Sequence, residues 1–313
     1  MKKILVTGAL GHIGSKLIKD LPKILKKTEI TMIDNFVTQR FTSLFNLEKK
    51  NKYKFYELDV VFNKFKIEKI IKKIDIVIHL AAITDAANSF KNPKLVEKNN
   101  LLSTKIISNL CSKHKKKLIF ISSTSVYGSQ NETVDENCSK DELQPQSPYA
   151  ITKLKEENLI KNLIKNKKLK SVICRFGTIY GYSPGMRFHT AVNKFIFNAF
   201  IDKKMPIWKT ALDQQKPFLS VNDFTRAIIF LLEKNIWGET FNCVSISANI
   251  FDVVNIILKI FPTAKFEYID GPPVSNISQK ISTEKICSLG FEFEGNLYDG
   301  IYDSVEFLSK PIW

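Results

Sequence analysis

The chain has few residues of the kinds that build disulfide frameworks, zinc sites or membrane spans. Its five cysteines have no paired short spacing over 313 residues. This distribution indicates neither a zinc site nor a disulfide framework, and it fits a reducing compartment. No apolar run approaches the length that crosses a bilayer, and the chain begins on the β-like run KKILVTG and not on a signal peptide. We therefore expect a cytoplasmic protein with no metal site and no membrane attachment.

Arginine is scarce as well. Only Arg40, Arg175, Arg187 and Arg226 occur among 47 basic residues, so lysine supplies nearly all of the formal net charge of +16. Such a charge is compatible with nucleic-acid binding. However, the lysines are spread over many predicted helices, whereas a nucleic-acid groove more often combines Arg with interleaved aromatics. We expect no nucleic-acid partner; a smaller anionic ligand needs only a few of these charges.

Short β-branched runs alternate with longer helical patterns through the first half of the chain. The predicted strands are Ile4–Thr7, Ile30–Ile33, Lys54–Leu58, Ile76–His79, Leu118–Ser122 and Ser171–Arg175. The predicted helices are Ile13–Leu25, Phe62–Lys72, Pro93–His114 and Pro148–Asn166. This alternation predicts an α/β fold, a Rossmann-type doubly wound parallel sheet with helices on both faces.

The regular alternation ends after Arg175. Helical patterns at 222–233 and 249–260 then mix with short strands and a Gly-, Pro- and aromatic-rich stretch, FGTIYGYSPGMRFH. We expect a dinucleotide-binding domain over residues 1–175, with a return segment near 215–245. Residues 176–313 should form mainly a smaller substrate-binding lobe.

The first predicted strand runs into a glycine-rich turn, and a helix follows. The turn reads Gly8-Ala9-Leu10-Gly11-His12-Ile13-Gly14. Strand, tight turn and helix N-terminus together are typical of a dinucleotide site. The glycines let the backbone approach a pyrophosphate, whose charge the helix N-terminus stabilises.

Acidic and small residues follow the next strands. Asp34 ends the second strand, where a carboxylate can accept both hydroxyls of an adenosine ribose and repels a 2′-phosphate, so NAD is favoured over NADP. Asp59-Val60 follows the third strand, where an acidic side chain could meet the adenine amino group. His79 is followed by Leu80-Ala81-Ala82, which would let a cofactor lie across the fourth strand.

A tyrosine and a lysine four residues apart occur in SPYAITK, at the start of a predicted helix. Tyr149 and Lys153 share one helix face, and an ammonium beside a phenol favours the phenolate. In a lysine-rich chain one such pair is expected by chance. Ser123, however, ends the fifth strand beside the crevice where ligands bind in such sheets. A serine, a phenol and an ammonium are therefore predicted near one dinucleotide site.

These motifs resemble the extended short-chain dehydrogenase/reductase family, in its nucleotide-sugar epimerase/dehydratase branch, and most of all the UDP-glucose 4-epimerases. The matching stretches are TGALGHIG, DNF, LDV, HLAA, NNLLST around Asn100, SSTSVYG, SPYAITK and PFLSVNDFTRAI. The resemblance implies that Tyr149 is the general base, that Lys153 holds the nicotinamide ribose, and that Ser123 hydrogen-bonds the reacting oxygen. It also adds Ile13, Asn35, Asn100 and Phe176 to the expected cofactor site.

The residues beside Ser123 distinguish the chemistries of this branch. The 4,6-dehydratases resemble TDE, the UDP-glucuronate decarboxylases TSE, and GDP-fucose synthases carry a Cys at the third place, whereas this chain has Ser123-Thr124-Ser125. Hydroxyls do not replace a carboxylic acid in an elimination. The pattern favours a 4-epimerase in which NAD takes a hydride and returns it. Two alternatives stay open: a dehydrogenase or ketoreductase of an activated sugar, and a non-catalytic dinucleotide-sensing protein.

The expected substrate site departs from the pattern of similar enzymes. Lys216 stands where an Arg usually holds the diphosphate, which keeps the charge but loses the bidentate fork. Arg187 is a second candidate for a phosphate contact, His189 lies where GDP-fucose synthases keep an acid, and Trp208 could stack on a nucleobase. Thr124 and Ser125 complete the expected substrate contacts. The family also implies a homodimer through the helices 93–114 and 148–166.

Overall fold

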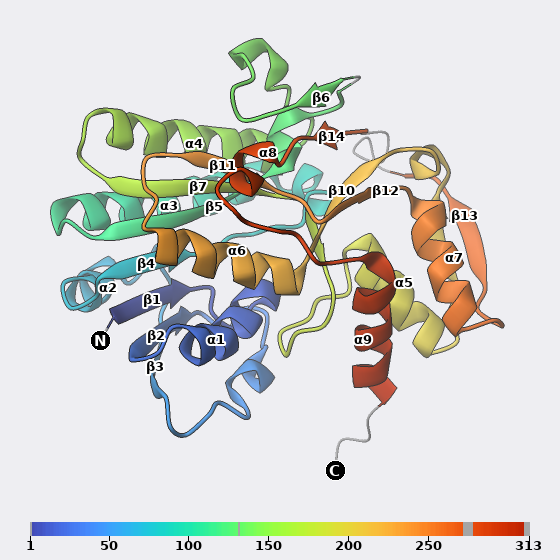
Figure 1. Ribbon diagram of the computed structural model, residues 1–313, viewed down its shortest axis with the longest axis horizontal. Coiled ribbons are helices and arrows are strands. Elements are labelled where there is room, and N and C mark those ends of the chain that lie inside the picture. The colour runs from blue at the N-terminus through green and yellow to red at the C-terminus, as the bar shows by residue number, and fades with distance from the viewer. Residues whose placement is uncertain (1, 131, 272–277, 310–313) are drawn as a thin grey trace.

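The computed structural model describes residues 2–130, 132–271 and 278–309, and its centre is a seven-stranded parallel sheet (Figure 1). The strand order is β11-β7-β5-β4-β1-β2-β3. The strands are β1 (Lys2–Thr7), β2 (Thr28–Asp34), β3 (Lys52–Glu57), β4 (Ile76–His79), β5 (Lys117–Ser123), β7 (Lys170–Phe176) and β11 (Thr240–Cys243). The order reverses between β1 and β4, and ligands bind at the carboxyl ends of strands at such a point. The predicted fold class is confirmed.

Helices cover both faces of this sheet because its strands are apolar on both sides. In β1, Ile4 and Val6 join a core with α1 (His12–Ile24) and α6 (Val221–Lys234). Leu5 points to the other face and joins a core with α2 (Lys64–Ile71), α3 (Pro93–Lys113) and α4 (Pro148–Lys165). The alternation of side chains along one strand thus anchors both helix layers.

A second lobe lies beyond the carboxyl ends of the strands. It holds a three-stranded sheet of β8 (Thr178–Tyr180), β10 (Lys216–Ser220) and β12 (Ile246–Ala248). A ladder of β9 (Met205–Trp208) and β13 (Phe266–Ile269) lies beside α5 (Ala191–Phe200), α7 (Ile250–Ile260) and α9 (Leu297–Ser309) (Figure 1). These helices share a core of their own. The chain returns to the large sheet through α6 and β11. The remaining short elements are β6 (Thr133–Val134), β14 (Lys280–Ile281) and α8 (Glu284–Cys287).

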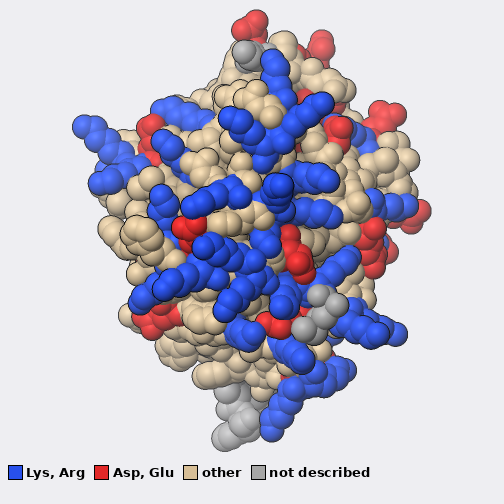
Figure 2. Space-filling model, turned by 90° about the vertical axis from the view of Figure 1, so that its left-hand side faces the viewer, with Lys and Arg blue, Asp and Glu red and all other residues tan. Residues whose placement is uncertain are grey.

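Lysine crowds the face that holds the amino ends of the parallel strands (Figure 2). Exposed lysines lie where helices give way to strands, as at Lys72-Lys73 before β4 and Lys167-Lys168 before β7. Cations near a helix C-terminus interact favourably with the helix dipole. These lysine pairs lie at the edge of the sheet opposite the carboxyl ends of the strands. Among the described residues, no helix is both long and apolar enough to cross a membrane.

A buried ion pair joins α4 to β7 of the large sheet. Arg175 of β7 and Glu157 of α4 are 1% and 0% exposed, and two guanidinium nitrogens donate to the carboxylate at 2.9 and 2.7 Å. Ser122 also donates to Glu157, and Arg175 donates to the hydroxyl of Tyr127. Burial by itself lowers the pKa of Arg175, but Glu157 raises it and the net shift is upward. This network fixes the helix that carries Tyr149 and Lys153 against the end of β5.

We expect Arg175→Met to lower the free energy of unfolding by about 3 kcal/mol, because a buried carboxylate then loses its main partner. Urea denaturation followed by circular dichroism measures this loss. The matched control is Lys161→Met, since Lys161 contacts the same carboxylate at 3.1 Å from a half-exposed position. It should cost less than about 1 kcal/mol. Equal losses in the two variants would contradict the role given to the buried pair.

Candidate active site

A cavity of about 880 Å³ lies at the carboxyl ends of the sheet and extends to the second lobe. Its walls come from the turns after β1, β2 and β4, the end of β5, the start of α4, and β9 and β10. The volume suits a dinucleotide together with part of a second ligand. Nearly all of the residues that the sequence predicts for the site line this one cavity.

The glycine turn forms the floor at the start of α1. Gly8 has φ +65°, and a Cβ there would lie 2.7 Å from the backbone nitrogen of Ala81. A Cβ on Gly14 would lie 2.5 Å from the carbonyl oxygen of Gly8, so the first turn of α1 packs directly on the turn. Gly8, Gly11, His12 and Ile13 line the cavity, whereas Gly14 lies behind them. The backbone can therefore approach an anionic ligand at the N-terminus of a 13-residue helix.

His12 adds a polar atom to this floor. Its Nδ1 lies 2.8 Å from the hydroxyl of Ser183, and its Nε2 has no hydrogen-bond partner among the described residues. Burial lowers the pKa of His12 well below its usual value, so the ring is neutral near pH 7. An orphaned polar atom in a cavity wall is expected to meet a ligand.

The carboxylate of Asp34 ends β2 and borders the cavity. It accepts hydrogen bonds from the backbone nitrogens of Leu10, at 3.0 Å, and Phe36, at 3.1 Å, which hold it beside the glycine turn. Asn35 donates to Asp59, whose other oxygen accepts from the nitrogen of Val61. These contacts suit Asp34 as the carboxylate that meets a ribose diol. The carboxylate of Asp59 lies further along the wall and already accepts hydrogen bonds from Asn35 and Val61. Asn35, Asp59 and Val60 line the same wall.

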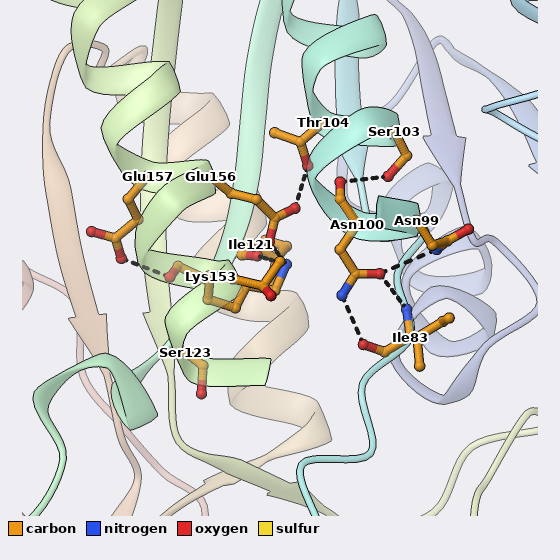
Figure 3. Close-up of polar contacts among 12 residues, drawn as sticks. Ile83, Asn99, Asn100, Ser103, Thr104, Ile121, Ser123, Lys153, Glu156 and Glu157 are labelled. Atoms are coloured by element: carbon orange, nitrogen blue, oxygen red, sulfur yellow. Dashed lines mark hydrogen bonds and ion pairs between the residues drawn. The ribbon is translucent and has the colours of Figure 1, made fainter. Parts of the chain in front are cut away.

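The loop after β4 is held by an amide from α3. Leu80, Ala81 and Ala82 line the cavity, as does Phe176 at the end of β7. Asn100 does not; it is fully buried behind the loop. Its Oδ1 accepts from the backbone nitrogen of Ile83 at 2.8 Å, and its Nδ2 donates to the Ile83 carbonyl at 2.9 Å (Figure 3). Asn100 therefore shapes the wall and does not form its surface.

The structure brings Ser123, Tyr149 and Lys153 to one wall. Ser123 ends β5 and accepts a hydrogen bond from the hydroxyl of Ser125 at 2.9 Å, so its own proton is available to another acceptor. Tyr149 lies in the first turn of α4, which Ser147 caps by accepting from the nitrogen of Ala150. The ammonium of Lys153 lies 6.0 Å from the centre of the Tyr149 ring. The phenol of Tyr149, the ammonium of Lys153 and the hydroxyl of Ser123 therefore border the same part of the cavity.

The end of the cavity next to the second lobe is rich in cations. Arg187 donates to the hydroxyl of Thr84, and its Nε has no hydrogen-bond partner among the described residues. Burial lowers the pKa of Arg187 and lowers that of His189 to about 4. Burial also lowers the pKa of Lys216 to about 8. The lining residues that the sequence predicts here are Thr124, Ser125, Arg187, His189, Trp208 and Lys216.

Sequence reasoning missed the contacts that join distant segments around this site. Gly185 packs on the glycine turn, where a Cβ would lie 2.3 Å from the carbonyl oxygen of Leu10, and its nitrogen donates to the Ser15 hydroxyl. Gln279 donates to the carbonyl oxygens of Thr124 and Gly128. No local pattern could reveal either contact, since the partners lie about 150 to 170 residues apart. Within the described residues no group of His, Cys, Asp or Glu could hold a metal ion.

Comparison with known proteins places this geometry in context. The model of the NAD dependent epimerase/dehydratase family matches residues 4–243. An uncharacterized UDP-glucose epimerase, YtcB, of Bacillus subtilis is 30% identical over 98% of this chain and 98% of its own. A dTDP-D-glucose 4,6-dehydratase of Dictyostelium discoideum is 32% identical over 77% of this chain, and the chain spans only 58% of that relative.

Solved structures agree. UDP-glucuronic acid 4-epimerase from Bacillus cereus, in complex with UDP-glucuronic acid and NAD, superposes with a TM-score of 0.86 at 30% identity, over 98% of each chain. UDP-glucose 4-epimerase from Thermus thermophilus in complex with NAD has a TM-score of 0.85 at 21% identity, over 97% of this chain and 98% of its own. The second likeness supports the fold alone.

We expect Asn100→Ala to weaken NAD binding about tenfold, because two buried hydrogen bonds to the loop at Ile83 are lost. Equilibrium dialysis against NAD⁺ measures the dissociation constant. The control Asn109→Ala removes an exposed amide from the same helix and should leave binding unchanged. An Asn100→Ala protein that binds NAD as tightly as the unmodified protein would show that the loop holds its shape without this amide.

Proposed function

Because the chain belongs to the NAD-dependent epimerase/dehydratase family, we propose that it is an NAD-dependent 4-epimerase of a nucleotide-activated sugar. The observation that carries the proposal is the wall formed by Ser123, Tyr149 and Lys153, which borders the same cavity as the glycine turn. At the three places from Ser123 to Ser125 the chain offers only hydroxyl side chains. This donor set can move a proton to and from a sugar oxygen, and it lacks the acid that an elimination needs.

The residues present fit NAD at the floor of the cavity. Gly8 and Gly14 leave the backbone open to a diphosphate, and the α1 N-terminus favours its charge. The carboxylate of Asp34 would accept the two hydroxyls of the adenosine ribose. His12 Nε2, which lacks a partner among the described residues, would meet the diphosphate. When bound, NAD accepts a hydride from the sugar carbon and gives it back, so no external reductant is consumed.

The chain's own residues would move the proton. The phenolate oxygen of Tyr149 takes the proton from the C4 hydroxyl as the C–H bond breaks, and the carbon becomes a ketone. Ser123 donates a hydrogen bond to the same oxygen. The ammonium of Lys153 stabilises the phenolate and holds the nicotinamide ribose. After the ketone turns over in the cavity, return of the hydride to its opposite face, together with return of the Tyr149 proton to the oxygen, would give the opposite configuration at C4.

Dehydratases among the relatives make elimination the competing chemistry. Elimination needs a carboxyl group beside the reacting carbon. Asp85 does line the cavity, but its two oxygens already accept hydrogen bonds from the backbone and side-chain nitrogens of Asn88. A dehydrogenase would use the same wall as an epimerase and would differ in exchanging its cofactor at each turnover.

We assign the substrate to the second lobe. Arg187 and Lys216 place two cations in the cavity, which suits the two phosphates of a nucleoside diphosphate, and Trp208 offers a flat apolar surface beside them. UDP-glucuronic acid, which the Bacillus cereus neighbour binds, and UDP-glucose, after which the Bacillus subtilis relative is named, are the first compounds to test. In this proposal residues 176–313 form mainly the substrate lobe, and α6 and β11 return to the cofactor domain.

Assembly and location complete the proposal. A homodimer would use the outer faces of α3 and α4, where Lys105, Lys155 and Asn162 border a shallow groove. The described structure has no disulfide among its five cysteines, and such thiols suit a reducing cytoplasm.

We expect the purified protein to release NAD⁺ on denaturation and to interconvert a UDP-sugar with its C4 epimer without added cofactor. Tyr149→Phe should lower kcat by at least about 100-fold, because the proton acceptor is removed. Product analysis by NMR measures both statements. The control Tyr302→Phe alters a half-exposed hydroxyl on α9 and should leave kcat unchanged. Turnover only with added NAD(H), and net oxidation or reduction, would replace the epimerase by the dehydrogenase.

The KM for the nucleotide sugar should rise above pH 8. Burial lowers the pKa of Lys216 to about 8, so its ammonium, and its attraction for a diphosphate, is lost as the pH rises through that value. From about pH 7 to pH 9 we expect KM to rise about tenfold. Lys216→Arg keeps its charge over this range and should remove the rise, whereas Lys216→Met should have a high KM throughout. A Lys216→Met protein whose KM still rises between pH 7 and pH 9, as in the unmodified protein, would show that the diphosphate binds elsewhere.

A further inference from the structure

A buried carboxylate lies against the lysine of the proposed catalytic wall. Glu156 of α4 is 1% exposed, and its Oε2 lies 3.2 Å from the Nζ of Lys153 one helical turn earlier. Its Oε1 accepts a hydrogen bond from the hydroxyl of Thr104 on α3 (Figure 3). The proposed reaction as described above gives this carboxylate no role.

The carboxylate lies against one side of the ammonium. A lysine ammonium has three protons and no acceptor. One is donated to the backbone oxygen of Ile121 at 3.1 Å, and another side of the ammonium faces Oε2 of Glu156, which lies 3.2 Å away in an ion pair. The Phe120 ring, 4.8 Å from Nζ, covers a further side. The third proton is left for the cavity, which Lys153 lines. Glu156 and Ile121 together therefore aim this proton.

The carboxylate also keeps the ammonium charged. Burial by itself lowers the pKa of Lys153, since a low-dielectric site disfavours the charged form. Glu156 contributes the largest opposing effect, Tyr149 adds to it, and the net shift of the pKa is upward. A lysine at this position without a counter-charge would lose its proton more easily.

The neighbouring Glu157 shows that two buried carboxylates on α4 have different partners. Glu157 is buried too, but its oxygens meet Arg175, Ser122 and Lys161, so it ties α4 to the sheet. Glu156 has no arginine partner among the described residues, and its partners are Lys153 and Thr104. Of these two adjacent carboxylates, Glu157 therefore binds the sheet and Glu156 binds the lysine that lines the cavity.

We propose that Glu156 is a positioning residue for Lys153, and that Thr104 in turn fixes the carboxylate. It orients the ammonium toward the ribose of the bound nicotinamide nucleotide and keeps it protonated. The inference rests on the proposed function in taking Lys153 as the cation that holds this ribose. Glu156 does not touch substrate or cofactor and acts through Lys153 alone.

The decisive variant is Glu156→Gln, which keeps the shape of the side chain and removes its charge. We expect kcat to fall about tenfold with KM for the sugar nucleotide unchanged, because the cation beside the phenol is less well placed. Removing the negative charge lowers the pKa of Lys153. The decline of kcat on the alkaline side should therefore begin at lower pH. Glu156→Asp keeps the charge and should keep the alkaline limit of the original protein, with part of kcat lost.

Binding of NAD⁺ gives a readout that needs no turnover. In equilibrium dialysis, Glu156→Gln should bind NAD⁺ about threefold more weakly than the unmodified protein near pH 8, and the gap should widen as the pH rises. The matched control is Glu68→Gln, because Glu68 is also a carboxylate paired with a lysine, Lys113, and it also contacts His114, but it lies away from the cavity. It should leave NAD⁺ binding and the pH profile unchanged.

A folded Glu156→Gln protein with the original kcat, pH profile and NAD⁺ affinity overturns the proposal. If this variant does not fold, Thr104→Val decides, because it leaves the charge and removes only the hydrogen bond that fixes it: weaker NAD⁺ binding supports the role, and unchanged binding overturns it. If the unmodified protein binds NAD⁺ but converts no sugar nucleotide, the epimerase proposal fails, while the NAD⁺ affinities of the variants still test Glu156.

Discussion

The buried ammonium of Lys153 is the constraint around which the site is arranged. A charge without water persists only where other groups compensate it. Here the compensation comes from a carbonyl of β5 and a carboxylate of α4, so strand and helix must meet at a fixed separation. The ion pair of Glu157 and Arg175 holds the same helix to the same sheet a short distance away. The geometry of Ser123 and Tyr149 follows, since they end and begin these two elements.

The cofactor-binding half of the site depends on close contacts between backbone segments, which glycines allow. Gly8 and Gly14 let the turn after β1, the loop after β4 and the start of α1 come into direct backbone contact. Thr7 adds a hydroxyl that binds His79 and the nitrogen of Ala81, so the ends of β1 and β4 are tied where the sheet order reverses. Small residues at these places shape a ligand site whose floor is mostly backbone.

The strands and helices of the large sheet could be predicted because each one is encoded by a pattern within its own short segment. Six strands of the large sheet and the helices between them were expected from periodicity, with ends displaced by at most two residues, as at β3, expected at Lys54–Leu58 and observed at Lys52–Glu57. The edge strand β11 fell only within an expected return segment. The roles of individual site residues stay predictions. Glu156 could not be identified, because in a lysine-rich helix its charge looks like one more solvated surface residue. The contact of Gly185 with Leu10 depends on a fold that no short pattern encodes.

That contact bears on the choice between an epimerase and a dehydrogenase. The segment from Ser183 to Gly185 belongs to the second lobe, yet it bonds His12 and Ser15 of α1 across the glycine turn. Thr42, after β2, donates to the carbonyl of Pro184. A diphosphate on the floor would thus lie beside a strap, residues 183–185, that is connected to the second lobe. Exchange of the whole dinucleotide at each turnover would require these hydrogen bonds to break, whereas a hydride that is taken and returned requires no exchange. Within the proposed function, the strap favours the reaction in which the cofactor stays bound, because it joins the glycine turn to the second lobe.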